Sequence, residues 1–176
     1  MKVGHVFNIP PEPLAAENTT FYDAGPVQIG IELRHITADS LRLTYKDDPA
    51  ALAALEASLA AGDGSEVDVD DGGLSVHVVE AASGHEYLRF DCFDEDPHYH
   101  YVHRTAPGEE PQNRWVRYDS VANGRMLPWV RKCLTTRLPE MLADADAAEL
   151  AAQVDRAVAA AAINRIPEMR GLDESN

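Results

Sequence analysis

The chain has 176 residues and is 45% hydrophobic, which suits one domain with its own core and excludes wholesale disorder. Its formal net charge of −15 argues against nucleic acid and anionic membranes as partners, because both bind basic protein surfaces. The two cysteines, Cys92 and Cys133, show no CxxC spacing, and no apolar run approaches membrane-spanning length. We therefore expect a protein of a reducing cytoplasm without a disulfide framework.

Residues 1–25 contain three closely spaced prolines and are predicted to form an extended arm, since proline lacks the N–H that helices and central strands need. Such an arm lies across its own domain or reaches a partner. A single domain is predicted over residues 26–163, followed by a polar tail over residues 164–176.

The domain begins with two β-like segments, Pro26–Ile36 and Leu41–Lys46, which predict a hairpin about Thr37–Ser40. Asp48 then precedes a proline and a leucine stripe. This pattern predicts a short helix with Asp48 as its N-cap.

A meander of four antiparallel strands is predicted between Glu66 and His103. Its three turns are indicated by Asp71-Gly72, Ser83-Gly84 and the stretch 94–97, which are separated by runs of period two. A short strand at Arg114–Tyr118 follows.

Two amphipathic helices are predicted at the C-terminal end, one starting at Pro128 and the other at Asp146. The fold class is therefore α+β: an antiparallel meander sheet with one short early helix and a C-terminal antiparallel helix pair that covers one sheet face.

The stretch from Leu88 to Arg104 is the candidate site, because three of the seven histidines fall within six of its residues. A loop over residues 94–97 would place Asp91 opposite His100 and Arg89 opposite Val102. The same turn logic would place Val76 opposite Asp91 and Val78 opposite Arg89. One face would then carry ionisable groups among aliphatic side chains, which predicts a partly dry pocket.

The first candidate chemistry is an acid–base pair of Asp91 and His100, because a carboxylate bonded to one imidazole nitrogen makes the other a usable base. His98 is a third catalytic candidate. Arg89, Tyr87, Phe93, Val76 and Val78 would bind a small organic substrate, and no cofactor would be needed. An Asp–His pair in a pocket resembles the chemistry of small cystatin-like dehydratases and isomerases. The alternative is a purely structural cross-strand pair.

The second candidate is a metal site, because His98-x-His100 resembles the HxH of cupins and Asp91 would be a third ligand. The cupin pattern continues with a glutamate, and Arg104 stands at that place. We expect no stoichiometric metal from sequence, since convergence of the carboxylate with both imidazoles depends on an uncertain register.

A third reading is a non-catalytic accessory protein that docks a partner through its arm and its C-terminal helices. For each of these hypotheses we predict a homodimer. The arm and the helix pair have more apolar surface than one small sheet can cover, and two-fold dimers are the commonest oligomers.

Overall fold

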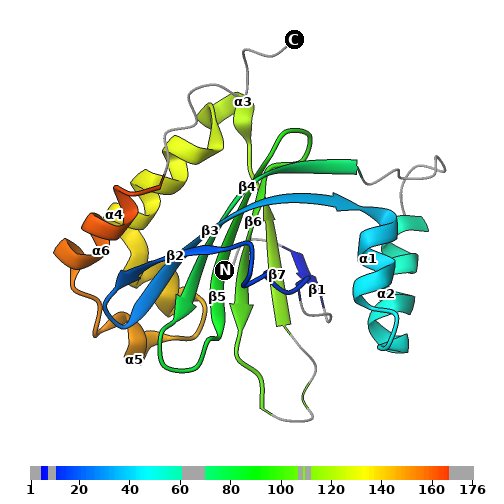
Figure 1. Cartoon of the computed structure of the whole chain (residues 1–176), viewed down its shortest axis with the longest axis horizontal. Helices are drawn as coiled ribbons and strands as arrows, with labels where there is room; N and C mark the ends of the chain where they lie inside the picture. Colours follow the sequence, from blue (N-terminus) through cyan, green and yellow to red (C-terminus); the bar gives the residue numbers. More distant parts are fainter. Residues whose placement is uncertain (1–4, 8–10, 61–69, 107–108, 110–111, 167–176) are drawn as a thin grey trace.

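The computed structural model describes residues 5–7, 11–60, 70–106, 109 and 112–166, and it confirms the α+β class (Figure 1). The described residues form one antiparallel sheet with strand order β1-β7-β6-β5-β4-β3-β2. Its strands are β1 (His5–Phe7), β2 (Thr20–Ala24), β3 (Val27–Thr37), β4 (Asp70–Glu80), β5 (Glu86–Phe93), β6 (His98–His103) and β7 (Gln112–Arg117). The helices are α1 (Ala38–Thr44), α2 (Pro49–Ala60), α3 (Ser120–Asn123), α4 (Met126–Asp144), α5 (Ala148–Ala151) and α6 (Arg156–Ile163).

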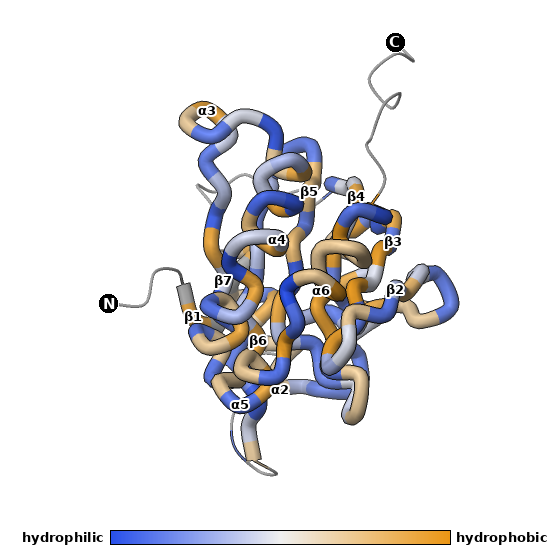
Figure 2. Tube along the Cα trace, turned by 90° about the vertical axis from the view of Figure 1, so that its left-hand side faces the viewer, coloured by the Kyte–Doolittle hydropathy of each residue, from blue (hydrophilic) through white to orange (hydrophobic). Residues whose placement is uncertain are grey.

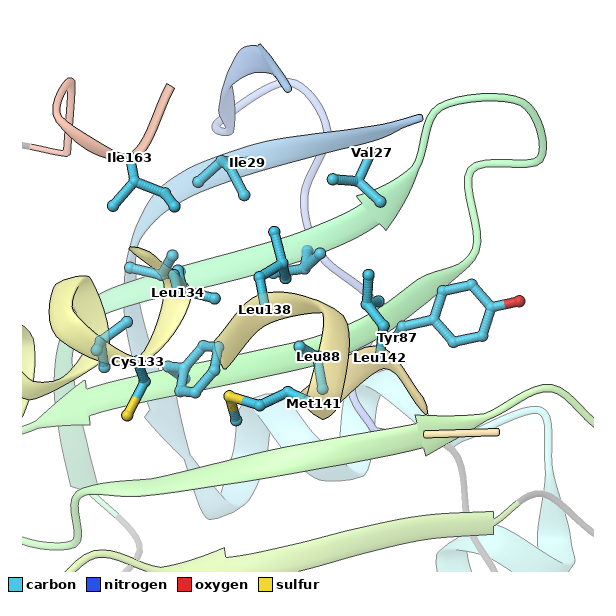
Figure 3. Packing of buried hydrophobic residues seen from close by; sticks show 14 of the residues in the cluster. Val27, Ile29, Tyr87, Leu88, Cys133, Leu134, Leu138, Met141, Leu142 and Ile163 are labelled. Atoms are coloured by element: carbon cyan, nitrogen blue, oxygen red, sulfur yellow. The ribbon is translucent and has the colours of Figure 1, made fainter. Parts of the chain in front are cut away.

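One sheet face is apolar and packs against α4 and α6, which lie in front of the strands in Figure 2. Alternate residues of the central strands are fully buried here, among them Ile29, Val76, Val78, Leu88 and Phe90. They meet a stripe of α4 that includes Leu134, Leu138 and Leu142, together with Ile163 of α6 (Figure 3). This face is the main hydrophobic core.

The opposite sheet face is also buried, yet it is polar. Its central strands present charged or hydrogen-bonding side chains that are all under a tenth exposed: Glu32, Arg34, Ser75, His77, Arg89, Asp91 and His100. Buried ionisable groups are costly unless they are paired, so this face must be held together by ion pairs and hydrogen bonds.

The N-terminal segment covers the polar face. Because β1 and β2 occupy opposite edges of the sheet, the chain between them has to cross it (Figure 1). On the way Glu12 pairs with Arg34 at 2.7 Å, and the Ala15 N–H donates to Glu32 at 3.4 Å. Residues 11–19 therefore lie across their own domain, and residues 5–7 and 20–24 are strands of the sheet.

Two predicted turns are wrong. Thr37–Ser40 does not join two strands; it begins α1, where Thr37 and Ser40 form a reciprocal capping box. Asp71 and Gly72 lie inside β4 opposite Ile36 and His35 of β3, and the predicted strand preceding them falls mostly at 66–69, outside the described residues. Glycine allows β3 and β4 to approach closely here, since a Cβ at Gly72 would lie 2.7 Å from the Arg34 carbonyl oxygen.

The meander of β4, β5 and β6 and the Asp48 cap of α2 are confirmed. The second C-terminal helix is divided into α5 and α6, because Asp155 starts a new helix by capping Ala157 and Val158. Asp146, the predicted start, lies between α4 and α5 with a positive φ of 62°. Ile166 is buried, so the core continues into the predicted tail, whose residues 167–176 lie outside the described part.

Candidate metal centre

The β5–β6 register brings Asp91, His98 and His100 onto the polar face. Asp91 pairs with His98 and Arg89 pairs with His100, so the predicted pairing of Asp91 with His100 is wrong by two residues. A shift of two positions keeps every side chain on its face, because strand residues alternate with period two. Asp91 therefore still meets both imidazoles.

The β4–β5 register differs from the prediction by one residue, and a shift of one residue moves each β4 side chain to the opposite face of the sheet. Ser75 and His77 stand opposite Asp91 and Arg89, while Val76 and Val78 point into the helix-side core. Tyr87 is the extra residue of a β-bulge, since Val78 pairs with Leu88 and Val79 with Glu86, and it too joins that core.

Val76, Val78 and Tyr87 are therefore not walls of the site. Of the predicted substrate-binding residues, Arg89 is buried on the polar face beside Glu86, and Phe93 contacts His98 edge to face at 5.7 Å between ring centroids.

The central geometry is a convergence of three ligand-type atoms. Asp91 Oδ2 lies 3.3 Å from His98 Nε2 and 3.3 Å from His100 Nε2. The three atoms all lie within 4.8 Å of one another, and Asp91 is 1% exposed. Two imidazoles and one carboxylate at such separations can share one transition-metal ion with coordination positions to spare.

Each of the three side chains is anchored through its other polar atom. His98 Nδ1 lies 2.6 Å from the Asp96 carbonyl oxygen, and His100 Nδ1 lies 2.7 Å from Asn113 Oδ1. Ser75 Oγ donates to Asp91 Oδ1. Outer partners of this kind fix the tautomer and the orientation of metal ligands, and here they leave both Nε2 atoms and Oδ2 pointing at a common centre.

The charges in the site follow from this arrangement. Burial raises the pKa of Asp91, but the contacts with His100 and His98 and the charges of His98 and Arg89 outweigh it, so the pKa falls well below the usual range. Burial lowers the pKa of His98, and Asp91 more than restores it. The pKa of His100 stays lowered by burial, with the charge of His98 adding to that effect.

A second buried cluster adjoins this centre on the same face. His77 Nδ1 lies 2.6 Å from Glu86 Oε1, and His77 Nε2 lies 3.4 Å from Glu32 Oε2. The Arg89 guanidinium donates to both oxygens of Glu86. Alternating charges therefore run across the sheet and balance one another.

Sequence reasoning missed Ser75, Asn113, Arg34, His77 and Glu86. Because the predicted β4–β5 register was wrong by one residue, Ser75 and His77 were assigned to the opposite face of the sheet. Asn113 lies in β7, paired with β6, one residue before the short strand predicted at Arg114–Tyr118. One available signal was the alternation of Gly30, Glu32 and Arg34 with aliphatic residues, which indicates a strand with two different faces.

A cavity of about 560 Å³ lies at the end of the sheet, between the strand ends and the start of α4. Arg34 and Phe93 line it, and both also lie beside the three converging side chains.

Residues 21–169 match a family model described as Domain of unknown function (DUF7700), and the chain belongs to this family. No curated protein and no solved structure matches it. Among the described residues, no helix has the length and apolar character needed to cross a membrane.

Proposed function

We propose that this member of the DUF7700 family is a metal-dependent enzyme that holds one divalent transition-metal ion through Asp91, His98 and His100. The observation that carries the proposal is the set of outer anchors. Each ligand has its second polar atom occupied by Asp96, Asn113 or Ser75, so its remaining atom faces the shared centre. Such an ion would activate a bound water or polarise a bound substrate.

The same contacts disfavour a metal-free acid–base pair. A general base needs one imidazole nitrogen held by the carboxylate and the other turned toward the substrate. In both His98 and His100 the Nδ1 atom is engaged by a neighbouring acceptor and Nε2 faces Asp91. This leaves neither ring with a nitrogen directed at a substrate, so the order of the two hypotheses from sequence is reversed.

Metal binding to the purified protein tests the proposal. Metal-stripped protein is titrated with Zn²⁺, Mn²⁺, Fe²⁺, Co²⁺ and Ni²⁺ by calorimetry, and its metal content after dialysis is measured by mass spectrometry. We expect one ion per chain, and we expect His98→Ala, His100→Ala and Asp91→Asn each to abolish tight binding.

His35→Ala is the matched control, because His35 also contacts a carboxylate, Asp70, but its side chain is 68% exposed and outside the centre. This variant should bind as wild type does. The proposal is wrong if none of the five ions binds stoichiometrically, or if binding survives the loss of either His98 or His100 in a folded protein.

A further inference from the structure

Arg34 of β3 stands beside the proposed metal ligands with part of its guanidinium uncommitted. Its side chain is 5% exposed, and its Nη2 donates to Glu12 at 2.7 Å. Nη1 is buried and makes no hydrogen bond to any residue that the structure describes. Buried donors without an acceptor are rare, and leaving one unpaired costs about 1–3 kcal/mol.

The nearest carboxylate does not satisfy this donor. Asp91 Oδ1 lies 3.9 Å from Nη1, which is too far for a hydrogen bond, and it already accepts from Ser75. The open N–H is thus held next to the carboxylate whose other oxygen faces the two histidines. Arg34 and the three candidate ligands therefore share one face of the sheet.

The charges of the polar face point to the sign of a ligand for this donor. Four buried or half-buried carboxylates, those of Glu12, Glu32, Glu86 and Asp91, face the guanidinium groups of Arg34 and Arg89 and the His77 ring. Burial lowers the pKa of His77, but its contacts with Glu32 and Glu86 raise it overall. The donor left open belongs to a guanidinium cation, so an acceptor that carries a negative charge suits it best.

We propose that Arg34 is the substrate anchor of this site: it binds the carboxylate group of an anionic substrate while that substrate also occupies an open position on the metal ion. The proposal rests on the proposed function and adds the substrate class to it. Arginine suits the role because its planar fork matches a carboxylate in two parallel hydrogen bonds.

Glu12 occupies part of the same guanidinium in the substrate-free protein. It reaches Arg34 from the N-terminal segment and also accepts from Thr44 Oγ1 at 2.9 Å. An incoming carboxylate that uses both sides of the fork has to displace it, so removal of the Glu12 charge should favour the substrate.

The experiment uses acetate as the probe and Co²⁺-loaded full-length protein, whose visible absorption reports ligands entering the metal coordination sphere. Acetate should change the spectrum saturably in wild type. Arg34→Gln should retain Co²⁺ and weaken acetate binding about 10- to 100-fold, the equivalent of one charge-assisted hydrogen bond. Arg34→Lys should fall between the two, and Glu12→Gln should bind acetate more tightly than wild type.

The variants separate the two ideas. If Arg34→Gln and Arg34→Lys hold Co²⁺ and bind acetate as wild type does, the anchor is refuted while the metal site stands. Should Arg34→Gln fail to fold, an unchanged acetate affinity in Glu12→Gln and Arg34→Lys refutes the anchor equally.

If wild type binds none of the five ions, the proposed function fails. Acetate is then titrated against metal-free protein labelled with ¹⁵N-arginine. A saturable shift of the Arg34 Nε signal would support an anion site without metal, and no shift would overturn the anchor as well.

Discussion

The orientation of the two site histidines depends on hydrogen-bond acceptors that are not themselves candidate metal ligands. His100 Nδ1 is held by Asn113 of β7, two strands away from Asp91 along the sheet. Without that acceptor the ring is free to rotate or to change tautomer, and Nε2 no longer points at the shared centre.

Asn113→Ala should therefore weaken metal binding about 10- to 100-fold without removing any ligand. Competition with a chromophoric chelator would measure the change. Asn123→Ala, which alters a surface asparagine of α3, is the matched control and should leave the affinity unchanged. Equal affinities for Asn113→Ala and wild type would show that the Asn113 contact does not position His100.

Strand register explains which parts of the site could be predicted from the sequence. The β5–β6 error was two residues, so Asp91, His98 and His100 were correctly placed on one face. The β4–β5 error was one residue and exchanged Val76 and Val78 for Ser75 and His77. Period-two patterns identify strands. The β-bulge at Tyr87 adds one residue to β5 and so shifts its pairing with β4, and a single sequence carries no clear signal for such a bulge.

The glycines of β4 also misled the prediction, because the same residues can mark a turn or allow two strands to approach closely. Asp-Gly usually marks a tight turn, but Gly72 and Gly73 allow strands to approach closely. A Cβ at Gly73 would lie 2.5 Å from the Cys92 carbonyl oxygen, next to Phe93.

Gly73→Ala should therefore lower the free energy of unfolding by about 1–3 kcal/mol, because backbone must move to admit the methyl group. Chemical denaturation measures the effect. Val121→Ala, at a side chain that is 98% exposed, should stay within about 0.5 kcal/mol of wild type. A Gly73→Ala protein as stable as this control would mean that β4 and β5 separate more easily than the contact implies.

The whole molecule is a sheet between two unlike layers, a hydrophobic one under α4 and α6 and an ionic one under the N-terminal segment. The sequence predicted that C-terminal helices cover one face of the sheet, but the β4–β5 register error put Val76 and Val78 of that face on the other one. The second layer was invisible to hydrophobic periodicity, since its stability depends on pairing between residues distant in sequence. The homodimer stays a prediction.

The ionic layer makes stability depend on pH. Burial raises the pKa of Glu86, but the charge of Arg89 and hydrogen bonds from His77 and Arg89 lower it from 4.5 to about 2. A carboxylate with a depressed folded-state pKa stabilises the fold above its unfolded pKa, and this contribution is lost as pH falls from about 4.5 toward 2.

Glu86→Gln should thus be destabilised by about 3–5 kcal/mol at pH 7, because it leaves the buried Arg89 guanidinium without the carboxylate to which it donates. The gap to wild type should narrow as pH falls from 5 to 3 in urea unfolding series. A gap that stays constant over this interval would show that Glu86 is not ionised in the folded protein.

The placement of β1 has a consequence for biosynthesis. His5 pairs with Trp115, so β1 has to wait for β7, which is synthesised about 110 residues later, before it can join the sheet. At a translation rate of about 5–20 residues per second, that wait lasts about 5–20 s. During it β2 to β6 can pair in sequence while the crossing segment still lacks its far anchor. The nascent chain therefore has an interval in which its ionic face is open to ions of the surrounding solution, before β1 docks and the segment closes over it.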